Sequence, residues 1–251
     1  MKFKNNTLST VIFRIDFLNP ITVDDATLNK ACISIYPVVQ EETVNEQNVQ
    51  TSLNEKGEMS VERITNTFVN KKYSNRQLSR SITVSPRFVF TELKDYTNYE
   101  DTSKTFISVF DAIKNANPTA TIARIGMRYI NQVDLTNYKQ SARKNYIKGA
   151  LFESPFNGVI DTALQARTQH LVELVIDDYR VRCVTGLFNP DYPAAIKRHI
   201  ITLDFDAYIQ GGMTLEEVPS YLDRFHSSIE ALYDASIMSK QREIMGILGE
   251  D

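Results

Sequence analysis

Hydrophobic and polar side chains alternate along several segments, a period of two that is typical of strands in a sheet with one covered face. The longest such segment is 120–135, which places Ile125, Met127 and Tyr129 on one face and Arg124 and Arg128 on the other. The same pattern predicts strands at 10–18, 61–70, 77–84, 87–96, 168–185 and 197–208. The polar segment 40–60 is predicted to be extended and to end in a turn at 54–57, as a mobile edge.

Apolar residues spaced three and four apart predict helices over 23–35 and 103–116. A third helix is predicted to begin at Thr214, because Thr214 and Glu217 have the spacing of a capping box. Gly211 and Gly212 predict a turn before it, and 239–247 is predicted to extend the helical region. Helices separated by runs of neighbouring strands favour an antiparallel α+β fold.

The segments 87–113 and 199–225 align without a gap, which indicates an internal duplication. Thr102 and Thr214 are expected to precede matching helices, and matched apolar positions include Val89 with Ile201, Leu93 with Phe205 and Phe110 with Leu222. The alternative is chance similarity between two strand–loop–helix units. We therefore predict an α+β protein of two similar halves, each a mainly antiparallel sheet with helices packed on one face. The halves are 1–135 and 161–251, joined by a connector at 136–160, and the second ends in a long acidic helix.

The charge distribution argues against nucleic acid as a partner. The chain has 251 residues, 42% of them hydrophobic, and a formal net charge of −3, whereas duplex-binding proteins carry a basic excess. From residue 209 onward there are 3 basic and 8 acidic residues. These acidic side chains either face a basic partner or form a solvated helix face. The candidate interaction residues on this helix are Glu216, Glu217, Asp223 and Glu230.

Standard catalytic and metal-binding motifs are absent from the sequence, so we predict no catalytic residues, no cofactor and no metal site. The two cysteines, Cys32 and Cys183, are far apart and fit a reducing compartment. No apolar segment approaches the length of a membrane span, and we expect a cytoplasmic protein. Asp204 and Asp206 share a strand face, where they would either bind Mg²⁺ or transfer protons, or form a solvated surface. Asp177 and Asp178 are expected on opposite faces of one strand.

The most distinctive run is Arg124–Asn131, in which Arg124 and Arg128 flank Gly126 on one strand face. Two guanidinium groups beside a missing Cβ could clamp a carboxylate or phosphate. Alternatively, each arginine pairs with an acid on a neighbouring strand, and Gly126 relieves a packing conflict. Arg124, Gly126 and Arg128 are therefore the candidate anion-binding residues.

Features along nearly the whole chain resemble a sporadically distributed family of uncharacterised bacterial proteins of about this length. The opening strand leads to Asn19-Pro20, a helix closes at Tyr36-Pro37, and the strand pair 78–93 precedes the arginine–glycine run. The last helix departs from the family pattern at Arg224-Phe225-His226. The resemblance implies no activity and no catalytic residue. The patchy distribution of the family implies mobile operons of the phage-defence or toxin–antitoxin type.

These observations lead to two functional hypotheses. The first is a non-enzymatic protein-interaction or accessory subunit of such a phage-defence or toxin–antitoxin operon, with a protein partner of unknown identity. Homodimer formation is left open in this hypothesis, and neither nucleic acid nor a membrane is expected as a partner. The alternative is an enzyme or sensor that binds a small anionic ligand through the arginine pair on the strand.

Overall fold

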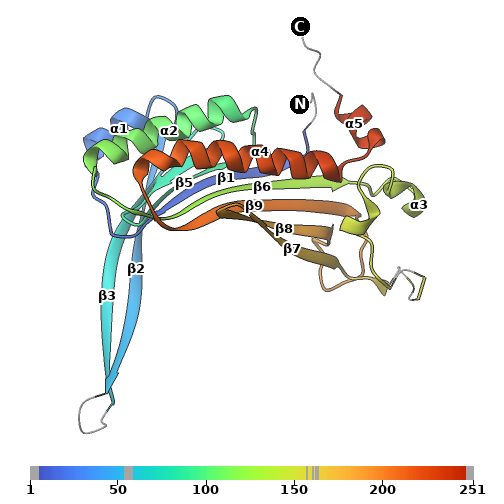
Figure 1. The fold of residues 1–251 in the computed structure, drawn as a ribbon, viewed down its shortest axis with the longest axis horizontal. Helices are drawn as coiled ribbons and strands as arrows, with labels where there is room; N and C mark the ends of the chain where they lie inside the picture. The colour runs from blue at the N-terminus through green and yellow to red at the C-terminus, as the bar shows by residue number, and fades with distance from the viewer. Residues whose placement is uncertain (1–5, 54–58, 157, 160, 162–163, 247–251) are drawn as a thin grey trace.

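Nine antiparallel strands form a single sheet, and the main helices lie on one of its faces (Figure 1). The computed structural model describes residues 6–53, 59–156, 158–159, 161 and 164–246. The strand order is β2-β3-β4-β5-β1-β6-β9-β8-β7. The expected α+β class is thus confirmed, but as one large sheet instead of a separate sheet in each half. Strands β1 and β6 pair near its centre, and the pairing of β6 with β9 joins the two predicted halves.

The elements have the following bounds. The strands are β1 (Leu8–Phe17), β2 (Val38–Leu53), β3 (Met59–Ser74), β4 (Arg80–Val84), β5 (Phe88–Leu93), β6 (Ile122–Asp134), β7 (Thr168–Ile176), β8 (Tyr179–Phe188) and β9 (Ile200–Met213). The helices are α1 (Asp25–Cys32), α2 (Tyr99–Ala116), α3 (Gln140–Arg143), α4 (Val218–Ser236) and α5 (Ser239–Met245), with short 3₁₀ turns η1 (Gly149–Leu151) and η3 (Leu215–Glu217).

The core lies between the sheet and the helical layer. In β6, Ile125, Met127 and Tyr129 are buried as expected, because successive side chains of a strand point to opposite faces. The ring of Phe13 meets that of Phe106 edge to face, with centroids 5.6 Å apart. Helices α2 and α4 run side by side over the middle of the sheet (Figure 1), linked by the Lys114–Glu216 ion pair of 3.0 Å. Both helices have one buried stripe, which explains the apolar spacing seen in the sequence.

Two strand predictions need correction. The segment 168–185 is not one strand but the hairpin β7–β8, which turns at Asp177 and Asp178. Asp177 adopts a φ of 51°, a left-handed conformation that aspartate tolerates, and the apolar alternation resumes at Tyr179, which conceals the turn. Gly211 and Gly212 lie within the end of β9 instead of forming a turn. In the polar segment 40–60, residues 40–53 are extended as predicted, and the turn at 54–57 lies outside the described residues.

Helix α2 starts four residues earlier than the sequence pattern predicts. Its N-cap is Asn98, whose side chain accepts a hydrogen bond from the backbone N–H of Asp101 at 2.8 Å. Thr102, expected before the helix, is therefore the fourth residue of α2 and is buried. Thr214 does precede its helix and makes the predicted capping box with Glu217. An Asn cap without a glutamate three residues later is a weaker sequence signal, and this explains the error.

Candidate interaction surface on the open face of the sheet

Strand β6 places both candidate arginines on the face of the sheet that α1, α2 and α4 do not cover. Arg124 is half-buried there and Arg128 is exposed, while the intervening Ile125 and Met127 are buried under the helices. The sequence prediction about the two faces of this strand is therefore confirmed. We call the uncovered side of β5, β1, β6, β9 and β8 the open face.

Each arginine binds a carboxylate of the neighbouring strand β9. Arg128 donates from Nε and Nη2 to the two carboxylate oxygens of Asp204, at 2.8 and 2.6 Å. Arg124 Nη2 lies 3.3 Å from both oxygens of Asp206, and its Nη1 lies 4.0 Å from Asp16. Of the two alternatives for these arginines, the described residues show the cross-strand ion pairs.

Gly126 makes room for the side chain of Arg124. A Cβ built at Gly126 would lie 2.6 Å from Arg124 Nη1 and 2.9 Å from its Cζ, well inside van der Waals contact. The guanidinium group therefore lies over the glycine, in the space that the sequence assigned to a ligand. This arrangement corresponds to the packing alternative for Gly126.

Charged and aromatic side chains continue this network over the neighbouring strands. Arg14 binds Asp16 in a two-pronged contact with distances of 2.7–3.1 Å, and its guanidinium lies 4.6 Å from the ring centre of Phe88. Arg124 lies 5.2 Å from the ring centre of Tyr208. The hydroxyl of Tyr208 donates a hydrogen bond of 2.9 Å to Glu173. The same carboxylate accepts a hydrogen bond of 3.1 Å from Arg180. Arginine, carboxylate and ring thus hold one another in place across the open face.

Burial changes the ionisation of this network. Desolvation raises the pKa of Asp206 above its usual value of 3.8, against the opposing pull of Arg124 and Arg128. The hydrogen bond to Asp204 raises the pKa of Arg128. Burial thus disfavours the charged form of Asp206, and the two neighbouring arginines oppose this effect.

The hairpin of β2 and β3 projects away from one end of the sheet, on the side opposite the helices (Figure 1). Arg87, in the turn between β4 and β5, forms an ion pair with Glu46 of β2 at 3.2 Å. Its guanidinium also lies 5.1 Å from the ring centre of Phe68 in β3. These contacts join the hairpin to the sheet beyond the residues where β3 pairs with β4, so the hairpin bounds the open face at this end.

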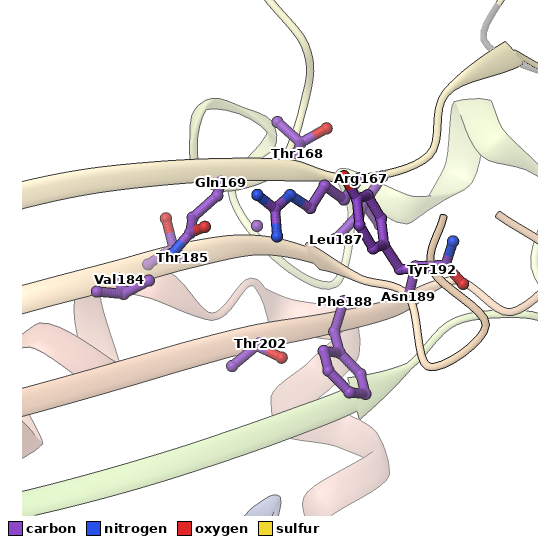
Figure 2. Close-up of a pocket in the computed structure, with 11 residues that line it drawn as sticks. Arg167, Thr168, Gln169, Val184, Thr185, Leu187, Phe188, Asn189, Tyr192 and Thr202 are labelled. Carbon is purple, nitrogen blue, oxygen red and sulfur yellow. The ribbon is translucent and has the colours of Figure 1, made fainter. Parts of the chain in front are cut away.

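A cavity of about 360 Å³ lies at the other end of the open face, between β7, β8, β9 and the loop that follows β8 (Figure 2). Its lining includes Arg167, Gln169, Phe188 and Thr202. Neither Arg124 nor Arg128 lines it. The Arg167 guanidinium lies 4.8 Å from the ring centre of Tyr192, so an aromatic ring already occupies the face of this cation.

The four acidic candidates of the last helix each contact a residue of the helical layer. Glu216 pairs with Lys114 and Glu217 caps its own helix. Asp223 accepts a 2.6 Å hydrogen bond from the hydroxyl of Tyr99, and Glu230 lies 4.0 Å from His226 Nε2. The structure thus places Asp223 in a contact of α4 with α2, Glu230 in a contact within α4, and Glu216 and Glu217 in contacts of η3.

His226 lies in an aromatic cluster that the sequence did not reveal. Its ring stacks on Tyr99 at 4.0 Å, and its Nδ1 is 3.2 Å from the hydroxyl of Tyr129, which is 3.1 Å from that of Tyr96. Burial lowers the pKa of His226 and raises that of Tyr96 to about 12. These groups come from α4, α2, β6 and the loop between β5 and α2, and only their tertiary arrangement brings them together.

In the described part of the chain, no three His, Cys, Asp or Glu side chains are grouped to hold a metal ion. Cys32 and Cys183 are both buried, and burial raises the pKa of the Cys32 thiol to about 12. No helix of the described residues is long and apolar enough to cross a membrane. Comparisons with protein-family models, curated proteins and solved structures find no match to this chain.

Proposed function

We propose that this chain is a non-enzymatic protein-interaction or accessory subunit and that its partner binds the open face of the sheet. The observation that carries the proposal is the uncovered layer of arginines and aromatic rings around Arg14, Arg124 and Arg128. In the described residues, α1, α2 and α4 all pack on the opposite face (Figure 1).

The composition of this surface favours a protein over other partners. Arginine and aromatic residues are enriched at the energetic centres of protein interfaces. Here Arg14 and Phe88, and Arg124 and Tyr208, are already stacked, so little side-chain entropy is lost when a partner covers them. Asp16, Asp206 and Asp204 pair with Arg14, Arg124 and Arg128, so these three arginines do not offer the uncompensated positive charge that binding to nucleic-acid phosphates requires.

The order of the strands is similar on the two sides of the sheet centre. Outward from the β1–β6 pair, the strands follow the order β1-β5-β4-β3-β2 on one side and β6-β9-β8-β7 on the other, so β2 has no counterpart. Val89 and Leu93 of β5 and their counterparts Ile201 and Phe205 of β9 are all buried. We infer from this correspondence that the segments 87–113 and 199–225 descend from one duplicated unit, although α2 begins before Thr102 and η3 begins after Thr214.

The ligand hypothesis has less support. An anion held by Arg124 and Arg128 would have to displace Asp206 and Asp204, two carboxylates fixed on the same sheet. Inorganic phosphate is a direct probe for this alternative. A rise in melting temperature with phosphate that is lost in Arg124→Ala and Arg128→Ala would favour the ligand, and we expect no such rise.

Site-specific photo-cross-linking in the native host tests the proposal. A benzophenone amino acid replaces the half-buried Phe90 on the open face, and a second variant carries it at the exposed Ser108 of α2 as the control. We expect a discrete cross-linked species from position 90 and none from position 108. Equal cross-linking from the two positions, or none from position 90, contradicts the proposal.

We include in the proposal a cytoplasmic setting and an accessory role in a phage-defence or toxin–antitoxin operon. The cross-linked protein would test both, because mass spectrometry of the adduct identifies the partner. A partner encoded beside this chain supports the operon role, and an unlinked partner removes it without affecting the binding surface.

A further inference from the structure

Strand β7 forms an edge of the sheet that carries exposed hydrophobic side chains on both faces. Among the described residues it pairs only with β8. Leu171 and Val175 point to the open side and are 59% and 71% exposed, and Val172 points to the helical side and is 53% exposed. The strand contains no proline, glycine or lysine. It therefore lacks the features that usually protect an edge strand from pairing.

The other edge of the sheet differs in this respect. Strand β2 carries Glu41, Glu42 and Glu46 along its length, and charged side chains on an edge oppose pairing with another strand. Glu41 pairs with Lys71 and Glu46 pairs with Arg87, so the two edges differ in their number of carboxylates, three on β2 against one on β7.

The single carboxylate of β7 is neutralised within its own chain. Glu173 accepts hydrogen bonds from Arg180 of β8 and Tyr208 of β9, and these contacts lower its pKa. A strand that paired with β7 would therefore need no cationic side chain to neutralise Glu173. Such a neutral, apolar edge fits another strand of the same character.

We propose that β7 pairs antiparallel with β7 of a second copy of this chain, so that two sheets join into one across a two-fold axis. The strand is complementary to itself in this arrangement. With the axis at Leu171 or Val172, Glu173 faces Gln169 or Leu171 of the other copy, and no like charges are directly opposite. An axis at Glu173 would oppose two carboxylates and is disfavoured. The proposal does not depend on the proposed function of the open face.

A second copy satisfies two further conditions. Its β7 is present at the same concentration as the first, and an isologous contact closes after two chains. Pairing of β7 with the glutamate-bearing edge β2 would instead leave free edges at both ends and build filaments. The apolar side chains of both copies would meet across the axis on each side of the sheet.

Solution mass is the first measurement. Light scattering during gel filtration is expected to give about twice the 28.7 kDa of one chain. Val172→Lys places a lysine on the edge and is expected to give the monomer mass with an unchanged melting temperature. Val49→Lys, at a β2 position that is 58% exposed, is the matched control and should remain dimeric.

Cysteine cross-linking locates the axis independently of any loss of stability. Leu171→Cys and Val172→Cys are each made in a Cys183→Ala background, because Cys183 lies directly opposite Val172 on β8. Residues that face each other on paired strands have Cβ atoms about 4.5–5.5 Å apart, close to disulfide geometry. We expect one of the two variants to form a disulfide-linked dimer on mild oxidation, and Val49→Cys to form none.

The outcomes separate the alternatives. A monomeric wild type with no cross-link at position 171 or 172 overturns the proposal. A dimer that persists in Val172→Lys shows that the chains meet elsewhere and also overturns it. A filament that Val49→Lys disperses assigns the edge to β2–β7 pairing, which contradicts the two-fold dimer.

Discussion

The two faces of the sheet come from the same strands but differ in how they are held. Under the helices, Phe13, Ile125 and Met127 are fully buried and pack by shape. On the open face, the intervening Arg14, Arg124 and Arg128 are held by carboxylates and aromatic rings while they stay accessible. The first arrangement contributes stability in proportion to buried apolar area. The second contributes little stability but presents ordered side chains, and we interpret it as the surface for recognition.

The largest expected difference between the faces concerns matched phenylalanines. Phe13→Ala removes a fully buried ring that packs against Phe106, and we expect it to lower the free energy of unfolding by about 3–5 kcal/mol. Phe90→Ala on the open face should cost about 1 kcal/mol, because that ring is only half-buried. Urea unfolding measures both. Equal losses would contradict the assignment of the core to one face.

Removal of the cap at Thr214 should cost less free energy of unfolding than removal of the Phe13 ring. Thr214→Ala removes the capping box with Glu217 and should lower the free energy of unfolding by about 1 kcal/mol. Thr202→Ala, in the strand β9 that precedes the helix, is the control for loss of a threonine hydroxyl, because its oxygen has no hydrogen-bond partner among the described residues. A larger loss of unfolding free energy in Thr202→Ala than in Thr214→Ala would contradict the assignment of the cap.

A carboxylate that faces the helical layer should stabilise the fold only above acidic pH. Bonds from Arg224 and Tyr221 lower the pKa of Asp178 to about 2. This stabilisation is complete above the usual value of 3.8 and is lost as pH falls toward about 2. Asp178→Asn should therefore lower the urea midpoint near pH 7 and have a much smaller effect near pH 2. A deficit that persists in acid would refute the linkage.

The open-face carboxylate Asp206 should behave in the opposite sense, with the smallest effect. Its pKa is raised on folding, so the folded chain holds this proton more tightly than the unfolded chain. The associated stabilisation is present in acid and is lost as pH rises from 3.8 through the raised pKa. Asp206→Asn keeps the group neutral and should not lower the melting temperature near pH 7. A clear drop would show that the Arg124 ion pair outweighs the cost of burial.

The fold was predictable from the sequence where a local pattern of residues determines which side chains are buried or where a helix begins. The two faces of β6 followed from strict alternation, and the Thr214–Glu217 cap followed from its spacing. The turn at Asp177 was missed because apolar alternation resumes at Tyr179, directly after the two aspartates of the turn.

The candidate site was predictable only in part. The sequence gives Arg124 and Arg128 on one face and Asp204 and Asp206 on another strand's face, but pairing them requires that β6 and β9 are neighbours. That adjacency depends on contacts about 80 residues apart in the chain, which no local pattern encodes. A search for two strands that carry opposite charges at alternate positions could have suggested that β6 and β9 are neighbours.

The most direct test of the account compares binding and stability in one variant of the open face. Arg128→Ala and the exposed α2 control Lys104→Ala are each combined with the photo-cross-linker at position 90, and melting temperatures are measured in parallel. The account predicts that Arg128→Ala loses the cross-linked partner while its melting temperature falls by only a few degrees, and that Lys104→Ala retains the partner. Full cross-linking in Arg128→Ala would show that the arginines of the open face serve the fold alone.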